Sequence, residues 1–133
     1  MCVFCEIAKG NIPSNKIYED DIVLAFFDIN PTSYGHALVI PKEHFDSFLT
    51  CPDEIQNHVF HVARQIANQL KNTLHCDGFN ILSNVGECSG QTIHHFHVHI
   101  IPRYENSKKD SVNISFGEID KVDFETLLKE VKR

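Results

Sequence analysis

The chain has 133 residues, of which 42% are hydrophobic and 23% are charged, and its formal net charge is −6 at pH 7. This length predicts a single domain over residues 1–133, and no apolar run reaches the ~20 residues of a membrane span. Because proteins that bind nucleic-acid backbones present basic patches, the acidic balance argues against a nucleic-acid partner.

The first residues, Met-Cys-Val-Phe-Cys-Glu, lack the charged and apolar regions of a secretory signal. We therefore expect a cytoplasmic protein, and a nuclear one as well if the source is eukaryotic. In a reducing compartment the five cysteines are thiols or metal ligands rather than disulfides. Cys2 and Cys5 have the spacing of a zinc knuckle, but the same spacing fits a redox pair or two unrelated thiols.

Residues 2–9 predict a short helix that ends at Gly10. Runs rich in β-branched and aromatic residues predict three strands, at residues 16–19, 22–29 and 37–41. The segment between the second and third runs is rich in turn-forming residues and predicts a loop. Asp28, at the end of the second strand, is either a turn carboxylate or an acceptor for a ribose diol.

Apolar residues at three- and four-residue steps from Ile55 to Leu74 predict one long helix. A strand over residues 79–83 follows it, and after Arg103 a polar connector leads to an amphipathic helix that starts near Asp120 or Asp123. Sequential strands joined by short loops favour an antiparallel sheet with helices packed on it. The fold class expected is therefore α+β, with five strands, one long helix and short terminal helices.

Four of the nine histidines fall within six positions, from His94 to His99. Histidine alternates with apolar residues from position 95 onward, which predicts a strand. Its two faces would carry His95, His97 and His99 on one side and Phe96, Val98 and Ile100 on the other. Pro102 is expected to end this strand because it lacks a backbone N–H.

The segment before the histidines, residues 84–92, contains two glycines and several small polar residues. Such a loop can offer backbone N–H groups, amides and hydroxyls to an anion. Loop and strand together predict a site for an anion that reacts with an imidazole. An alternative of another class is a storage or sensor protein in which the three histidines bind one metal ion.

Gly90-Gln91-Thr92, followed after two residues by the alternating run from His95 to Ile101, resembles the signature of the histidine triad (HIT) family. Three further blocks resemble that family in the same order: Cys2 to Cys5, Val23 to Pro31, and Gly35 to His44. The resemblance covers residues 2–103, and the fold of the family agrees with the α+β expectation.

The resemblance implies a nucleotide-binding enzyme that cleaves at the α-phosphate through a nucleotidyl-histidine. The resemblance implies four catalytic histidines. His97 is the nucleophile, His99 donates to the phosphate, and His95 and His36 complete the catalytic set. Asp28 would bind the ribose. The remaining residues that the resemblance assigns to the nucleotide are Phe4, Ile7, Ile12, Phe26 and Ile29 around the base, and Asn84, Gly90, Gln91 and Thr92 at the phosphate.

The N-terminal block most resembles the branch that hydrolyses purine nucleoside phosphoramidates and releases an amine with AMP or GMP. The alternative within the family is a dinucleoside polyphosphate hydrolase, which Gly90-Gln91-Thr92 and Ile101-Pro102-Arg103 also resemble. A third reading is a nucleotide-binding protein without catalytic function.

The resemblance also implies a structural zinc ion held by Cys2, Cys5, His44 and His95, with no organic cofactor. It implies a homodimer in which two sheets become continuous and the long helices pack together. A stripe of Val59, Val62 and Ile66 on the long helix is compatible with such a surface, although stripes of this kind usually belong to the chain's own core.

Overall fold

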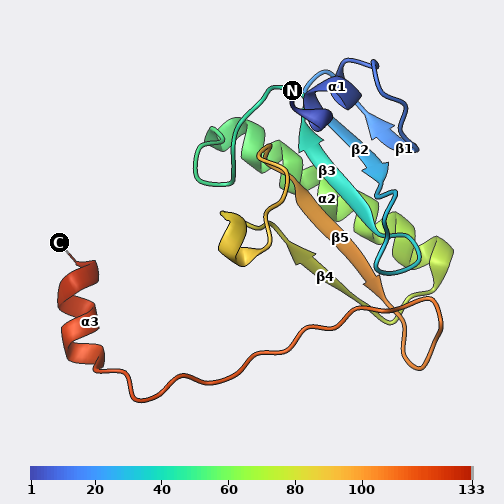
Figure 1. Ribbon diagram of the computed structural model, residues 1–133. Coiled ribbons are helices and arrows are strands. Elements are labelled where there is room, and N and C mark those ends of the chain that lie inside the picture. Colours follow the sequence, from blue (N-terminus) through green and yellow to red (C-terminus); the bar gives the residue numbers. More distant parts are fainter. Residues whose placement is uncertain (133) are drawn as a thin grey trace.

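One antiparallel sheet of five strands, in the order β1-β2-β3-β5-β4, organises the computed structural model, which describes residues 1–132 (Figure 1). The strands are β1 (Lys16–Glu19), β2 (Val23–Phe27), β3 (Ala37–Pro41), β4 (Gly78–Leu82) and β5 (Val98–Arg103). The helices are α1 (Val3–Ala8), α2 (Asp53–Leu74), the short 3-10 helix η1 (Glu87–Ser89) and α3 (Phe124–Val131). The α+β expectation is confirmed.

Helix α2 covers one face of the sheet, over β3 and β5 (Figure 1). Its apolar stripe packs on the alternate residues Phe96, Val98 and Ile100, which are fully buried. Val59, Val62 and Ile66 belong to this core, so that stripe offers no surface to a partner.

Helix α1 lies on the opposite face, where Phe4 and Ile7 pack with Phe26, Leu38 and Ile40. This second, smaller cluster lies beside the face of the sheet that carries the histidines of the last strand. Cys2 caps the helix, because its thiol accepts a hydrogen bond from the backbone N–H of Cys5.

The last strand differs from its prediction at both ends. It begins at Val98, after a bend at residues 93–95 that turns His95 toward the N-terminal cysteines. It also continues through Pro102, which pairs with Phe79 of β4. Pro102 lies beyond Ala37, the first residue of β3, which pairs with Ile100. A proline is tolerated where a strand has only one neighbour, because a missing N–H breaks no second ladder.

Beyond Arg103 the chain forms a loop and then an extended segment that ends in α3 (Figure 1). Helix α3 begins after Asp123, whose carboxylate accepts a hydrogen bond from the backbone N–H of Thr126, as expected of an N-cap. Among the described residues, no helix is long and apolar enough to cross a membrane.

Candidate active site

A cavity of about 290 Å³ opens on the α1 side of the sheet. Of the residues predicted to bind the nucleotide, all except Gln91 line it. They are Phe4, Ile7, Ile12, Phe26, Asp28, Ile29, Asn84, Gly90, Thr92, His97 and His99. One end is apolar, where the Phe4 and Phe26 rings meet edge to face at 5.7 Å between centroids. The other end carries His97 and His99 and the loop of residues 84–92, so the cavity has one apolar end and one polar end.

His97 is held as a neutral imidazole with one free nitrogen. Its Nδ1 lies 2.7 Å from the carbonyl oxygen of His95 and therefore donates to it. Burial lowers the pKa of His97, although this hydrogen bond opposes the shift. Ser83 fixes the same backbone from the other side, since its hydroxyl donates to the His97 carbonyl at 2.7 Å. The proton is thus on Nδ1, and Nε2 keeps the lone pair that a nucleophile requires.

His36 and His99 form a second, oriented pair. The backbone N–H of Thr32 donates to His36 Nδ1 at 3.2 Å, which places the His36 proton on Nε2. That nitrogen lies 3.0 Å from His99 Nδ1 and donates to it, so the His99 proton is on Nε2. Burial, with His97 and His36 nearby, lowers the pKa of His99 to about 4. His99 is therefore a neutral hydrogen-bond donor, 4.9 Å from the His97 ring between centroids.

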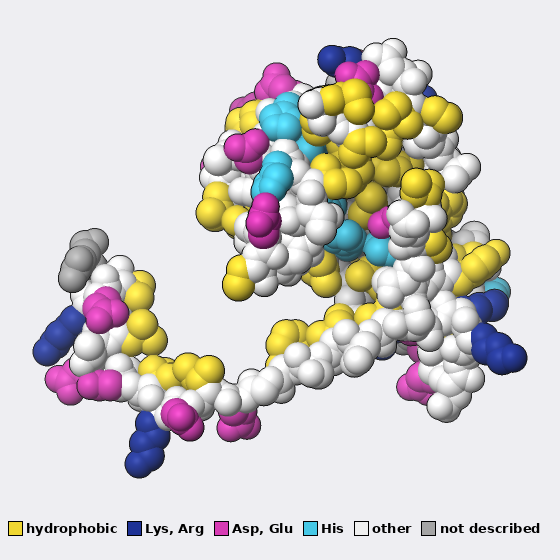
Figure 2. Space-filling model, in the orientation of Figure 1, with side chains coloured by type: hydrophobic (Ala, Val, Ile, Leu, Met, Phe, Trp, Pro, Cys, Tyr) yellow, Lys and Arg dark blue, Asp and Glu magenta, His cyan; other side chains and the backbone are white. Residues whose placement is uncertain are grey.

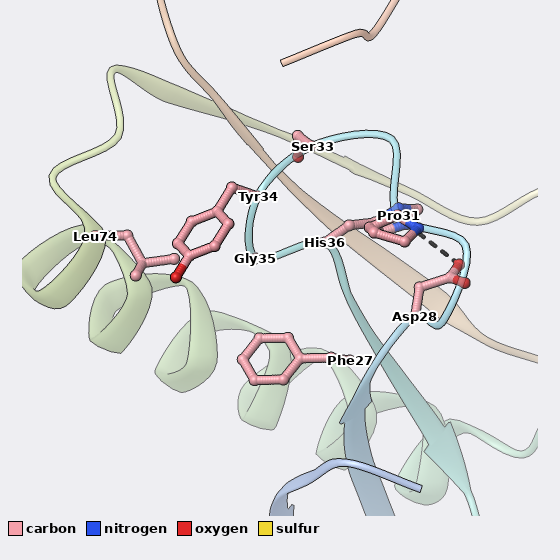
Figure 3. Close-up of a pocket in the computed structure, with 8 residues that line it drawn as sticks. All are labelled: Phe27, Asp28, Pro31, Ser33, Tyr34, Gly35, His36 and Leu74. Carbon is pink, nitrogen blue, oxygen red and sulfur yellow. Dashed lines mark ion pairs between the residues drawn. The ribbon is translucent and has the colours of Figure 1, made fainter. Parts of the chain in front are cut away.

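Asp28 closes this group at the end of β2. One carboxylate oxygen accepts from the backbone N–H of Asn30, and the other lies 3.8 Å from His36 Nε2. Figure 3 shows the carboxylate turned toward the His36 ring, beside a hollow of about 330 Å³ that Leu74 and Tyr34 also line. Asp28 lines both cavities, and its side chain remains 22% exposed.

The loop at residues 84–92 follows its expected chemistry only in part. Gly90 has φ +108°, and a Cβ there would lie 3.3 Å from the Asn84 amide nitrogen, so this position needs glycine. Gln91, however, is 3% exposed. Its side chain accepts from the Gly86 N–H and donates to the carbonyls of Asp46 and Ile93. Gln91 therefore braces the loop from behind, and the structure does not place it at a phosphate.

The four predicted metal ligands come together beside the bend at residues 93–95. Cys2 Sγ lies 3.4 Å from His95 Nδ1, and Cys5 Sγ lies 3.3 Å from His44 Nδ1 and 3.6 Å from His95 Nδ1. All four ligand atoms lie within 4.8 Å of one another. His95 is thus directed away from the cavity that His97 and His99 line.

These residues fit a tetrahedral zinc ion. Bonds of about 2.3 Å to sulfur and 2.0–2.1 Å to nitrogen separate the ligand atoms by about 3.5 Å, close to the distances here. His95 Nε2 donates to the Pro41 carbonyl at 2.8 Å, and His44 Nε2 donates to Asp46 at 3.1 Å. Both Nδ1 atoms therefore keep lone pairs, as zinc-bound imidazoles do. Burial raises the pKa of the Cys2 thiol, but hydrogen bonds with Cys5, His44 and Phe4 outweigh it and the pKa is lowered, whereas burial and the neighbouring Cys2 raise the pKa of Cys5.

Asp28, His36 and His99 also bring their ligand atoms within 4.8 Å. Their surroundings differ, because Thr32 donates to His36 Nδ1 where a metal-bound histidine would need an acceptor. The His36 nitrogen that faces the group is therefore protonated. The hydrogen bonds favour a proton-bearing pair over a second metal site.

Several residues of the site had no sequence signal. Thr32 acts through its backbone N–H, and Ser83 and Asp46 act as supports for His97 and His44. Ser14 lines the same cavity as His97, with a buried hydroxyl oxygen that has no partner among the described residues. Backbone donors and supporting hydroxyls occur in every loop, so their use becomes visible only in three dimensions.

The family model described as the HIT domain matches residues 9–106. An uncharacterized HIT-like protein of Methanocaldococcus jannaschii is 45% identical over 133 residues, with 99% of both chains covered. The adenosine 5'-monophosphoramidase of Saccharomyces cerevisiae is 40% identical over 77% of this chain and 62% of its own. The adenylylsulfatase of Arabidopsis thaliana is 42% identical over 78% of this chain and 53% of its own.

Solved structures agree with these relatives. A HIT family protein from Bacillus anthracis superposes with a TM-score of 0.89 at 41% identity, over 98% of this chain and 92% of its own. A zinc-bound histidine triad family protein from Mycobacterium smegmatis gives 0.76 at 40% identity, over 82% and 79%. The chain therefore belongs to the histidine triad (HIT) family.

Proposed function

We propose that this protein is a hydrolase that cleaves purine nucleoside phosphoramidates at the α-phosphorus through a nucleotidyl-His97 intermediate. The observation that carries the proposal is the free Nε2 of a neutral His97 on the wall of a nucleotide-sized cavity. The names of the yeast and Arabidopsis relatives, a phosphoramidase and an adenylylsulfatase, describe enzymes that act on AMP-type substrates and support it.

In the first step, His97 Nε2 attacks the α-phosphorus and the P–N bond to the leaving amine breaks. The amine takes one proton from water and leaves neutral. The positive charge that develops on the His97 ring is stabilised through Nδ1–H by the His95 carbonyl. His99, with its proton on Nε2, donates to a phosphate oxygen as charge builds there.

In the second step, a water molecule attacks the phosphorus of the nucleotidyl-histidine and the P–Nε2 bond breaks. The hydroxyl of the water stays on the nucleoside monophosphate, and its proton balances the one that the amine took up. The electron pair of the broken bond returns to Nε2, and His97, with its proton still on Nδ1, is neutral again. One water is consumed for each phosphoramidate cleaved.

The dinucleoside polyphosphate alternative rested partly on the Ile101-Pro102-Arg103 block. In the structure Arg103 donates to Asp110 at 2.8 Å and to Asn80 at 2.7 Å. Because these contacts anchor the segment after β5, the Arg103 side chain has a structural role. This removes one reason for preferring the dinucleoside branch.

The substrate class is tested by comparing kcat/KM for an adenosine phosphoramidate with kcat/KM for diadenosine triphosphate and tetraphosphate. We expect the phosphoramidate to be preferred by about 100-fold, a difference of about 2.7 kcal/mol in transition-state binding. Intact-mass spectrometry after rapid quench should show the nucleotidyl adduct. A preference for either dinucleotide, or no turnover of any of the three, would contradict the proposal.

The orientation of His99 by His36 gives a separate prediction. His36→Ala removes the donor to His99 Nδ1 and is expected to lower kcat by roughly 10- to 100-fold, as loss of an orienting partner does. AMP affinity should change less than kcat, because His36 does not itself line the nucleotide cavity. His36→Asn keeps an N–H donor and should recover part of the rate. Equal kcat values for the two variants would exclude an orienting role.

We also propose that residues 1–133 act as one domain and that the protein works in the cytoplasm as a homodimer. A further proposal concerns a metal: one structural zinc ion is held by Cys2, Cys5, His44 and His95. When bound, zinc would join the N-terminal segment to the bend before β5 and, with four protein ligands, would have no open position for water. The fit of the four ligand atoms and the zinc-bound Mycobacterium relative support the metal site.

A further inference from the structure

Ser14 carries a hydroxyl group with no use in the fold. Its side-chain oxygen is buried and has no hydrogen-bond partner among the described residues. Buried polar atoms nearly always have a partner, because losing water without gaining a partner destabilises the folded protein. Ser14 also lines the cavity that His97 lines. An unpartnered hydroxyl at the wall of a cavity indicates a partner that arrives with a ligand.

Ser14 belongs to the apolar end of this cavity. Ile12, two residues earlier, packs on the cluster that contains Phe4 and Phe26. Of the described residues in the segment 3–14 that line the cavity, only Ser14 has a polar side chain. Figure 2 shows hydrophobic side chains gathered over α1 and β2, with histidine side chains and an acidic side chain at the lower edge of that region. The Ser14 hydroxyl is therefore a single polar group in apolar surroundings.

The segment that carries Ser14 is fixed on both sides. Before it, the N–H of Asn11 donates to the Glu6 carbonyl at 2.9 Å, which attaches the segment to α1. After it, the Asn15 carbonyl accepts from the N–H of Phe27 at 3.0 Å, which attaches the segment to the end of β2. The backbone of Ser14 thus has a defined place, and rotation about χ1 is the freedom that its hydroxyl keeps.

A single hydroxyl at this end suits the polar edge of a purine base. Apolar walls alone bind rings of similar size with little selectivity. The six-membered ring of adenine or guanine has ring nitrogens and an exocyclic group at its edge. A serine hydroxyl donates one hydrogen bond and accepts others, so it can pair with an amino group, an oxo group or a ring nitrogen. It selects for a polar edge without choosing between the two bases.

We propose that Ser14 is a specificity residue whose hydroxyl hydrogen-bonds the polar edge of the six-membered ring of a purine nucleotide. A change of χ1 rotamer turns Ser14 Oγ from the wall toward the bound base. A flat ring without polar atoms at that edge leaves the hydroxyl unpaired and gains nothing from it. The inference rests on the proposed function for the kind of ligand, but it concerns binding and not the chemical step.

Titration calorimetry with two nucleoside monophosphates tests the contact. AMP has the polar edge, whereas benzimidazole riboside 5'-monophosphate has a fused ring of the same shape with carbon atoms there and no amino group. Ser14→Ala is expected to weaken AMP binding by about 5- to 10-fold and to change binding of the analogue by less than about twofold. Equal losses for the two ligands, no loss for AMP, or a wild type that binds neither would refute the contact.

Ser33→Ala is the matched control. Ser33 is 4% exposed and its hydroxyl oxygen also has no partner among the described residues, but Ser33 does not line the cavity that Ser14 lines. Its replacement should leave the affinities for both monophosphates within about twofold of the wild type. A loss of AMP affinity as large as that of Ser14→Ala would show that the effect does not come from the cavity.

Melting temperatures separate this role from a structural one. Because an unpartnered hydroxyl does not stabilise the fold, Ser14→Ala without nucleotide should melt at the wild-type temperature or above it. At one fixed AMP concentration its melting temperature should rise less than that of the wild type, since stabilisation by a ligand follows affinity. A lower melting temperature for the variant without nucleotide would assign Ser14 to the fold and overturn the proposal.

Steady-state kinetics with an adenosine phosphoramidate distinguish failure of this inference from failure of the proposed function. Ser14→Ala should raise KM by about the factor lost in AMP affinity and keep kcat within about twofold, as loss of uniform binding does. A fall in kcat with unchanged KM would contradict a role in binding the base. If the wild type turns over nothing but Ser14→Ala still loses AMP affinity selectively, the proposed function fails and the base contact stands.

Discussion

Replacing His97 with alanine is expected to lower turnover of an adenosine phosphoramidate by about 10⁴-fold or more, with the fold and AMP affinity largely retained. The ring supplies the attacking Nε2, and no other described residue is placed to take over that atom. His97 is a neutral side chain at the cavity wall, so its removal deletes a contact with bound AMP rather than a charge. The effect should therefore fall on kcat.

The measurement combines steady-state rates, intact-mass detection of the adduct, and AMP titration of the same preparation. His94→Ala is the matched control, because His94 is a neighbouring exposed histidine whose Nε2 lies 3.8 Å from the Glu87 carboxylate. It should keep its rate within about twofold. His95→Ala should lose stability as well as activity, since its ring is fully buried between Pro41 and the cysteines. Adduct formation by His97→Ala would assign the nucleophile elsewhere.

Replacing Cys5 with serine should reduce bound zinc from about one per chain to well below half, and it should lower the melting temperature by roughly 10 °C. Cys5 faces both His44 and His95, so its loss removes the sulfur that joins the N-terminal helix to the bend before β5. A loss of about 3 kcal/mol corresponds to that shift for a chain of this size. Chelation of the wild type should lower stability more than the rate of catalysis at a temperature where the fold persists.

Zinc is measured on protein purified without chelators or a polyhistidine tag, alongside melting curves. Cys88→Ser serves as the control, because Cys88 is exposed in the loop before the histidines and lies outside the four-ligand cluster. It should keep both its zinc and its melting temperature. If Cys5→Ser and Cys88→Ser contain the same zinc and melt together, the four-residue cluster is not a metal site.

The elements with strong local patterns could be predicted from the sequence. The strands at residues 16–19 and 37–41 have the predicted bounds, and the period of Ile55 to Leu74 identifies α2. Asp123 was one of two candidate N-caps, and it is the residue that caps α3. In each case the deciding interactions lie within a few residues of one another, so the sequence contains the information.

The departures come from contacts between distant segments. An alternating run predicts a strand from His95, but the chain bends there and His95 contacts Cys2 and Cys5, about 90 positions away. The helical pattern of α2 does not predict that His58 Nε2 lies 2.6 Å from the Asp20 carboxylate. Gln91 was assigned to phosphate binding by resemblance, whereas its buried amide satisfies the backbone of three loop residues. No local pattern reports such partners.

His95 has two chemically separate parts, and this separation matters for how the protein can change over time. Its ring points to the cysteine cluster, while its carbonyl oxygen fixes the proton of His97. Every amino acid has that carbonyl, so mutation of the side chain leaves the acceptor in place. A lineage could therefore lose its cysteines, refill the space around position 95 with other side chains, and still inherit a nucleophile in the correct tautomer.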